Sequence, residues 1–361
     1  MVLYQKKEEC CGCNACMEIC PEGAVSMVED REGFYYPQIN KSVCSDCGKC
    51  KRVCPIKSTK VEKDENLYFG VQVKDEKIRF SSSSGGIFSI LAYFVISRNG
   101  IVYGAGYDED MKVIHQKVED LSQLEQIKRT KYVQSDMSGI YNSIEMNLRE
   151  NRWVLFCGTP CQVQALKLFL NRQYERLILV DLVCYGVPSP GVWKKYVKYL
   201  ERKHGGRMTE FVFRDKRNKD DGHTLSYIID GKEYVDSIYE DNYCRMYFKN
   251  YILRMSCFNC KFCRVYRNSD FTIGDFWGIE HIRTEFNDGM GTSLVIVHSD
   301  QARRIWNEIQ KELFWFQCKK EELLQPRLLY PTNGDGGMNR IIFMLLYKIL
   351  PFSLAVKLAE R

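Results

Sequence analysis

The feature that most constrains this chain of 361 residues is a cysteine pattern that occurs twice near its start. The two copies consist of Cys10, Cys13, Cys16 and Cys20 followed by Pro21, and of Cys44, Cys47, Cys50 and Cys54 followed by Pro55. Three thiolates two residues apart can wrap three corners of one cubane, and the fourth cysteine of such a run ligates the other cluster. Proline ends each loop because it has no N–H and a fixed φ.

This spacing predicts two 4Fe–4S clusters with crossed ligation. The two ligand sets are Cys10, Cys13, Cys16 with Cys54, and Cys44, Cys47, Cys50 with Cys20. A zinc ribbon would need two CxxC pairs and not two runs of four that each end in proline. Cys11 is interpreted as a spare thiol, although a register shift of one residue would make it a ligand instead of its neighbour.

The composition agrees with metal binding in a reducing compartment. The chain has 17 cysteines and only five histidines, and residues 1–9 are polar and charged, so we expect no export signal and a cytoplasmic location. The formal net charge of +6 would be offset by the negative charge of three thiolate-bound clusters. Without a block of basic residues, this charge does not indicate nucleic-acid binding.

A change of composition predicts the domain boundary. Residues 57–66 are charged and lack an apolar core pattern, which is typical of a linker. We therefore predict a ferredoxin-like domain at residues 1–57, a linker at 58–66, a larger α/β domain at 67–335 and an apolar helical segment at 336–361.

The larger domain contains two successive strand–loop–helix units. Apolar runs at 153–156 and 177–183 each lead through a cysteine-containing loop into a helix, at 163–170 and 192–203. Such units favour a mixed, partly parallel α/β sheet, in which ligands gather at the carboxyl ends of the strands. Further expected elements are strands at 67–73, 271–278 and 292–298, helices at 87–97, 239–255 and 301–313, and a hairpin turn at Asp230-Gly231.

A third cysteine group, Cys257-x2-Cys260-x2-Cys263, suggests a further metal centre. A CxxC pair also fits zinc or reduced structural thiols, so these alternatives stay open. If the centre is a cubane, its remaining ligands must come from the strand-exit loops, where Cys161 and Cys184 are the candidates. Cys263 competes with them.

Serines and glycines at 81–86 precede the apolar helix at 87–97. Exposed N–H groups at such a helix start can bind an anion, such as a phosphate group, but the same residues also suit a plain helix cap.

Several short segments, in this order, together resemble one family. They are SSGGxF at 83–88, KYVQS at 131–135, GTPCQ at 158–162, CYGVPSP at 184–190, FRDK at 213–216, CxxC at 257–260 and TIGDFWG at 272–278. Over residues 67–335 the chain resembles the coenzyme F420 hydrogenase/dehydrogenase beta-subunit family, here preceded by a two-cluster ferredoxin domain.

The resemblance implies an FAD-dependent iron–sulfur oxidoreductase with a third 4Fe–4S cluster. It carries flavin binding over to Ser83, Ser84, Gly85, Gly86, Lys131, Tyr132, Gln134, Gly158, Thr159 and Pro160. It assigns the third cluster to Cys161, Cys184, Cys257 and Cys260. Cys263 departs from the family pattern, and many relatives act on substrates other than the deazaflavin coenzyme.

The expected function is electron transfer between a one-electron donor such as ferredoxin, the clusters, FAD and a hydride-accepting small molecule or deazaflavin-type coenzyme. A flavin is the usual converter between one- and two-electron carriers. The alternative is an electron-transfer subunit of a larger redox complex without a substrate of its own. No catalytic acid is assigned, since His223, His281, Arg283 and Asp275 read as ordinary surface or supporting groups.

Residues 341–358 are apolar but interrupted by Lys348 and Pro351, so a membrane span is not expected. A helix packed on the domain or a partner is the main interpretation. Peripheral contact with a membrane surface is the alternative.

Overall fold

The computed structural model of the chain describes residues 3–58, 65–219, 223–334 and 336–361. Most of the expected linker, residues 59–64, lies outside this part. The helices are α1 (Ala15–Glu18), α2 (Lys49–Arg52), α3 (Glu76–Phe80), α4 (Ile87–Ile96), α5 (Ile140–Arg149), α6 (Pro160–Leu170), α7 (Pro190–His204), α8 (Asn242–Phe248), α9 (Ile279–Ile282), α10 (Asp300–Ile309), α11 (Gly337–Leu346) and α12 (Phe352–Ala359).

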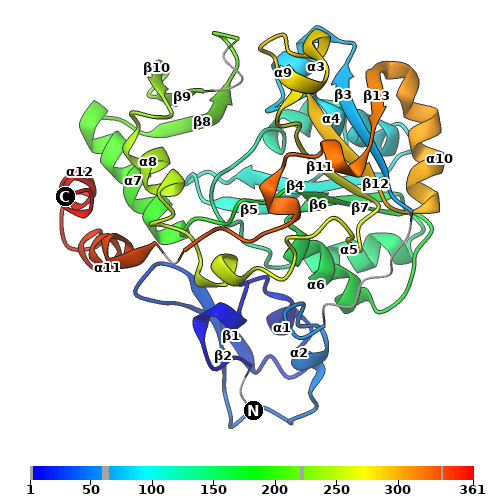
Figure 1. Cartoon of the computed structure of the whole chain (residues 1–361). Helices are drawn as coiled ribbons and strands as arrows, with labels where there is room; N and C mark the ends of the chain where they lie inside the picture. Colours follow the sequence, from blue (N-terminus) through cyan, green and yellow to red (C-terminus); the bar gives the residue numbers. More distant parts are fainter. Residues whose placement is uncertain (1–2, 59–64, 220–222, 335) are drawn as a thin grey trace.

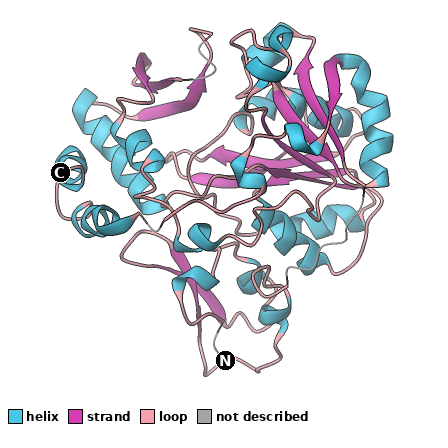
Figure 2. Cartoon of the chain, in the orientation of Figure 1, coloured by secondary structure: helices cyan, strands magenta, loops and turns pink. Residues whose placement is uncertain are grey.

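The strands form three sheets. They are β1 (Val25–Glu29), β2 (Tyr35–Ile39), β3 (Leu67–Val73), β4 (Ile101–Tyr107), β5 (Val113–Val118), β6 (Val154–Gly158), β7 (Leu177–Leu182), β8 (Met208–Asp215), β9 (Thr224–Ile229), β10 (Lys232–Ser237), β11 (Phe271–Asp275), β12 (Ser293–Val297) and β13 (Leu313–Cys318). The fold is thus a mixed α/β architecture behind a small ferredoxin-like unit (Figures 1 and 2).

The central sheet has eight strands in the order β13-β3-β12-β11-β7-β6-β4-β5. Its middle strands β11, β7, β6 and β4 are parallel, and the outer strands pair antiparallel. This confirms the mixed, partly parallel sheet. Helices α4 and α10 contact one set of strands, whereas α5 and α6 pack with α1 of the N-terminal unit. The parallel strands bring the loops after β6 and β7 to one edge.

Most expected elements are confirmed, with two exceptions. The helix expected at 239–255 is wrong: α8 ends at Phe248, Asn250 takes a positive φ of 66°, and residues 255–259 form a separate 3₁₀ turn, η3 (Met255–Asn259). The C-terminal apolar segment is two helices, because Pro351 separates α11 from α12. The hairpin turn at Asp230-Gly231 is confirmed, with φ values of 46° and 74°.

The N-terminal unit is joined to the larger one through buried polar contacts. Arg340 of α11 donates from both Nη atoms to the carboxylate of Glu32, at 3.0 and 2.8 Å. The Ser189 hydroxyl donates to the Glu32 carbonyl at 2.6 Å, and Phe34 is fully buried in the core of the larger unit. These contacts fix the β1–β2 hairpin against α7 and α11.

Within the described residues, no helix combines the length and the apolar character that crossing a membrane requires.

Candidate iron–sulfur centres and flavin site

The first cavity lies inside the N-terminal unit and has an empty volume of about 400 Å³. Its lining includes Cys10, Cys13, Cys16 and Cys54. The first three lie on the loop that leads into α1, and Cys54 follows α2. Cys11 and Cys50 also line the cavity, so it brings together the four predicted ligands of the first cluster with two further cysteines.

The second cavity, of about 310 Å³, is lined by the complementary set, Cys20, Cys44, Cys47 and Cys50. Cys47 is exposed, so this end of the unit is open to solvent. Cys50 also lines the first cavity, which makes the two cavities direct neighbours.

The third cavity is the largest of these cysteine-lined spaces, with about 550 Å³, and it lies at the carboxyl edge of the central sheet. Cys161 stands in the first turn of α6 after β6, and Cys184 follows β7. Cys257 and Cys260 enter from η3 and its end. The cavity is lined by six cysteines, Cys11, Cys161, Cys184, Cys257, Cys260 and Cys263. The four candidate ligands meet here, together with Cys11 and Cys263.

Burial shapes the chemistry of these thiols. It raises the pKa of Cys257 to about 12 and that of Cys184 well above its usual range. The side-chain hydrogen bond with Cys263 lowers the pKa of Cys260 to about 7. Without a metal, these two buried thiols therefore stay protonated. A bound metal would deprotonate them, because it binds the thiolate form.

In the part of the chain that the structure describes, no group of three or more Cys, His, Asp or Glu is arranged to hold a single metal ion. In a cubane each thiolate binds an iron at a different corner, so the four sulfur atoms lie farther apart than the four ligands of one zinc ion. The cysteine-lined cavities are consistent with such a cluster.

The three cavities form a row in which each neighbouring pair shares a cysteine. Cys50 lines the second and first cavities, and Cys11 lines the first and third. The side chains of Cys13 and Cys161, which line different cavities, both raise the pKa of the Cys11 thiol. The row runs from the exposed Cys47 to the edge of the sheet.

The predicted flavin residues fall into two groups. Ser83, Ser84, Gly85 and Gly86 form the turn before α4. Ser83 Oγ accepts a hydrogen bond from the N–H of Thr130 at 2.8 Å. Gly85 lies against the backbone of β3, where an added Cβ would stand 2.1 Å from the Val71 carbonyl oxygen, so close strand packing explains this glycine.

Lys131 and Tyr132 continue this first group. Burial lowers the pKa of Lys131 to about 7, and its ammonium lies 5.8 Å from the ring of Tyr107. The ring of Tyr132 stacks on Tyr247 at 4.7 Å between centroids. Tyr107 Oη and His115 Nδ1 are buried without a hydrogen-bond partner among the described residues, and burial, together with the charge of Lys131, lowers the pKa of His115 to about 4. These orphaned polar atoms fit a polar ligand such as a flavin ring.

The second group lies beside the clusters. The Gln134 amide donates to the carbonyls of Cys11 and Gly12 at 2.9 and 3.2 Å, so it supports the loop of the first cavity. Pro160 lines the third cavity, and the N–H of Thr159 donates to the Gln162 side chain at 2.9 Å. Gly158 packs on Phe156. The structure thus does not gather all ten predicted flavin positions in one place.

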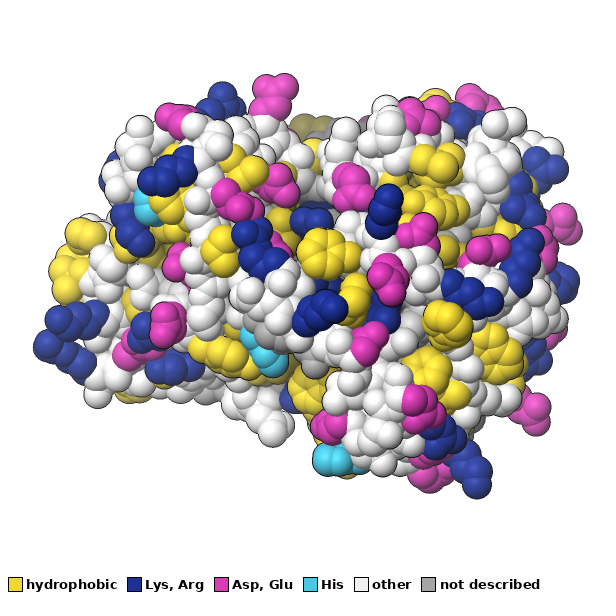
Figure 3. All heavy atoms as spheres, turned by 90° about the horizontal axis from the view of Figure 1, so that it is seen from above, with side chains coloured by type: hydrophobic (Ala, Val, Ile, Leu, Met, Phe, Trp, Pro, Cys, Tyr) yellow, Lys and Arg dark blue, Asp and Glu magenta, His cyan; other side chains and the backbone are white. Residues whose placement is uncertain are grey.

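A charged cleft lies near the first group, between the β8–β10 sheet and a wall formed by Phe80 and Arg129. It has an empty volume of about 780 Å³, and its lining includes Arg129, Arg214, Lys216, Arg217, Glu210 and Glu233. Figure 3 shows Lys, Arg, Asp and Glu side chains interspersed with hydrophobic ones on this face of the molecule. Lys216 Nζ donates to the Arg79 carbonyl at 2.9 Å and also to the Ser84 carbonyl, which ties the cleft to the predicted flavin turn.

The residues considered for acid catalysis are placed differently. His281 is exposed, and Asp275 accepts a hydrogen bond from Arg214 at 2.5 Å near the charged cleft. Sequence reasoning missed His115, Arg254 and the buried pair Asp181–Arg267, because single charged or polar residues carry no spacing signal.

Residues 151–319 match the family model that describes the C terminus of the coenzyme F420 hydrogenase/dehydrogenase beta subunit. Residues 9–58 match the model of the 4Fe-4S dicluster domain. A comparison with curated proteins gave no match.

Among solved structures, 12 chains match. One belongs to a xenon-derivatised F420-reducing [NiFe] hydrogenase complex from Methanosarcina barkeri, with a TM-score of 0.46 and 14% sequence identity over 83% of this chain and 91% of that chain. The dicluster model covers the cysteines of the two N-terminal runs, and the beta-subunit model covers Cys161, Cys184, Cys257 and Cys260. Residues 151–319 of the chain thus match the C-terminal part of the coenzyme F420 hydrogenase/dehydrogenase beta-subunit family, and residues 9–58 match a 4Fe–4S dicluster domain.

Proposed function

We propose that the chain is an FAD-dependent iron–sulfur oxidoreductase that moves electrons between an external one-electron donor, such as ferredoxin, and a hydride-accepting small molecule. The observation that carries the proposal is the row of three cysteine-lined cavities in which neighbours share a cysteine. The domain division at 1–57, 58–66, 67–335 and 336–361 is part of the proposal.

The ligand assignment follows the cavities. Electrons would enter at the second cluster, where Cys47 is exposed, and pass through the first cluster to the third. The proposed ligands of these clusters are Cys20, Cys44, Cys47 and Cys50; Cys10, Cys13, Cys16 and Cys54; and Cys161, Cys184, Cys257 and Cys260.

A bound flavin would supply the exchange between one-electron and two-electron carriers. The turn at 83–86, Lys131 and Tyr132 are the residues that we propose to hold it, joined by the orphaned polar atoms of Tyr107 and His115. The Lys131 amine, which donates to the carbonyls of Lys128 and Arg129, would place its charge beside an anionic part of the ring. Arg129, Arg214 and Arg217 line the neighbouring cleft and pair there with Glu210, Asp275 and Glu233, so an anionic substrate would bind by exchanging with these carboxylates.

The variant Cys260→Ser tests the relay through the third cluster. We expect it to keep both N-terminal clusters, because Cys260 lines only the third cavity, and to slow flavin reduction by a one-electron donor at least tenfold. Stopped-flow absorbance under anaerobic conditions measures this rate. Cys318→Ser is the control, since Cys318 is buried at the end of β13 and lines none of the three cavities.

Normal flavin reduction in Cys260→Ser would contradict the relay. Flavin reduction without any turnover of small-molecule acceptors would instead favour the role of an electron-transfer subunit in a larger complex, which the family's beta-subunit members make the second candidate.

We also propose peripheral contact of the C-terminal helices with an anionic membrane surface. Met338, Ile341, Leu345 and Ile349 are between 51% and 78% exposed. The exposed charged side chains of residues 336–361 are Lys348, Lys357 and Arg361. In an interfacial helix, exposed apolar side chains enter the membrane surface and basic side chains contact anionic lipid headgroups. Cosedimentation with anionic vesicles, lost in Ile341→Asn/Leu345→Asn, would support this contact, and equal recovery with and without vesicles would refute it.

A further inference from the structure

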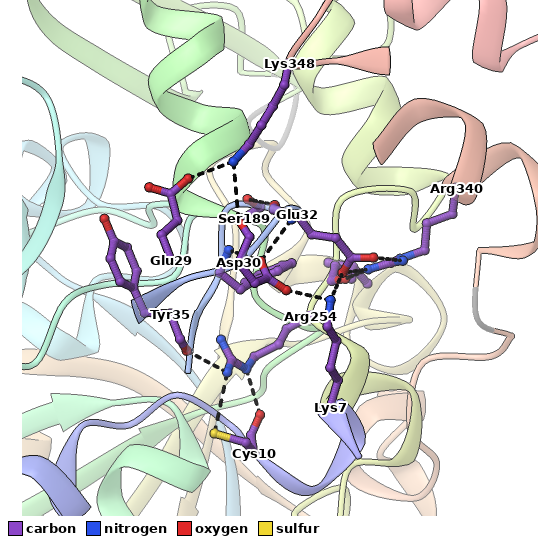
Figure 4. A network of polar contacts seen from close by, with 12 residues as sticks. Lys7, Cys10, Glu29, Asp30, Glu32, Tyr35, Ser189, Arg254, Arg340 and Lys348 are labelled. Atoms are coloured by element: carbon purple, nitrogen blue, oxygen red, sulfur yellow. Dashed lines mark hydrogen bonds and ion pairs between the residues drawn. The ribbon is translucent and has the colours of Figure 1, made fainter. Parts of the chain in front are cut away.

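Arg254 lies at the junction of the first and third cavities, and its side chain is fully buried. Its Nε donates to the Cys10 carbonyl at 2.7 Å, and its Nη2 donates to the Tyr35 carbonyl at 2.9 Å and faces Cys10 Sγ at 3.6 Å. Nη1 donates to Gln134 Oε1 at 3.0 Å. Figure 4 shows the guanidinium reaching toward Cys10 and Tyr35 from the opposite side of the interface.

The positive charge of Arg254 has no carboxylate partner among the described residues. Its polar contacts are two backbone carbonyls, one amide oxygen and one cysteine sulfur. The rings of Tyr36 and Phe34 lie 4.2 and 5.3 Å from the guanidinium carbon. The other buried arginines of the neighbourhood differ, because Arg340 pairs with Glu32 and Arg267 with Asp181. An unpaired buried charge is strongly unfavourable, so a negative group must stand nearby.

The negative groups that the structure offers are the thiolates of the cluster sites. Cys10 belongs to the first cavity, and Cys257, in the turn that follows Arg254, belongs to the third. The loop of the first cavity is built to approach the guanidinium: Gly12 has a φ of +66°, and a Cβ there would stand 2.6 Å from Nη1. Only glycine allows this approach without strain.

We propose that Arg254 is the buried counter-cation of the first cluster and raises its reduction potential above that of the second cluster. The proposal rests on the proposed ligand sets. A cluster gains one negative charge when it is reduced, and a nearby cation in a poorly screened site stabilises the reduced form more than the oxidised form. Arg254 is a positioning residue in this account, since it acts through the cluster.

The second cluster site lacks an equivalent cation among the described residues. Lys49 lines that cavity and Arg52 lies on the same helix, but both are exposed and screened by solvent. Arg254 therefore makes electron transfer from the second cluster to the first favourable, so that electrons collect next to the third cavity.

The test is a redox titration of the full chain, monitored by electron paramagnetic resonance, with iron analysis of each sample. In Arg254→Gln we expect one N-terminal cluster to shift to a more negative midpoint potential while the other stays unchanged. Arg254→Lys should retain most of the original potential, because it keeps the charge. Arg340→Gln is the matched control: it removes a buried arginine of the same interface that has its own carboxylate (Figure 4).

Unchanged potentials in an Arg254→Gln chain with full iron would overturn the proposal, and so would an equal shift in Arg340→Gln. If Arg254→Gln loses the first cluster, retention of iron and potential in Arg254→Lys supports the charge, and loss of iron in both variants overturns it. Absence of two N-terminal clusters in the unaltered chain would instead refute the proposed function.

Discussion

Replacing Cys54 by alanine is expected to remove one cubane, about four of about twelve irons per chain, and to leave the signal of the second cluster intact. Cys54 belongs to the second cysteine run by sequence, but in the structure it lines the first cavity with Cys10, Cys13 and Cys16. The cluster that we expect to be lost is therefore the first one, which is held mainly by cysteines of the first run. Iron and sulfide analysis, together with the spectrum of the dithionite-reduced chain, measures it.

Cys11→Ala is the matched control for Cys54→Ala. Cys11 is buried between the first and third cavities but is not a proposed ligand, so this variant should retain all iron. Loss of a cluster in Cys11→Ala with full iron in Cys54→Ala would contradict the crossed ligation and favour a register shifted by one residue.

The second large effect is expected for the buried pair Asp181–Arg267. The Asp181 side chain is 1% exposed and that of Arg267 is 3% exposed, with Oδ1 and Nη1 2.8 Å apart. Asp181 also accepts from Thr272 Oγ at 2.7 Å and Ser269 Oγ at 2.9 Å. Arg267→Met should lower the free energy of unfolding by about 3–5 kcal/mol, because it leaves a buried carboxylate without its counter-ion.

Denaturant unfolding followed by circular dichroism measures this loss, with the clusters loaded in every sample. Arg149→Met is the control: Arg149 is 67% exposed in its pair with Glu145, and its removal should change stability by less than about 1 kcal/mol. Equal effects of the two variants would show that the Asp181–Arg267 pair does not stabilise the strand exit that carries Cys184.

The cysteine sites could be read from the sequence because their signal is local. Tight spacing places three thiols of each run on one loop, and parallel strands bring Cys161 and Cys184 to one edge. Strands β3, β6 and β7 were predictable from continuous apolar runs. Strands β4 and β5 and helix α5 were not predicted.

The errors come from tertiary contacts. The aromatic segment 239–255 has a helical pattern, yet the chain turns at Asn250, where the Tyr251 N–H bonds to the Met246 carbonyl, and η3 then reaches the third cavity. Gln134 and Thr159 are predicted flavin positions, and the surroundings that the structure gives them, the carbonyls of Cys11 and Gly12 for Gln134 and the start of α6 for Thr159, could not be read from the sequence. Arg254 had no sequence signal, since its role depends on a loop more than 200 residues away.

Iron, sulfide and flavin analysis of the anaerobically purified chain, with its visible spectrum, tests whether the chain binds three cubanes and a flavin. We expect about twelve irons and one FAD per chain, which corresponds to three cubanes and a flavin. About eight irons without flavin would contradict it, leaving a two-cluster ferredoxin unit attached to a domain whose third cavity and charged cleft serve another purpose.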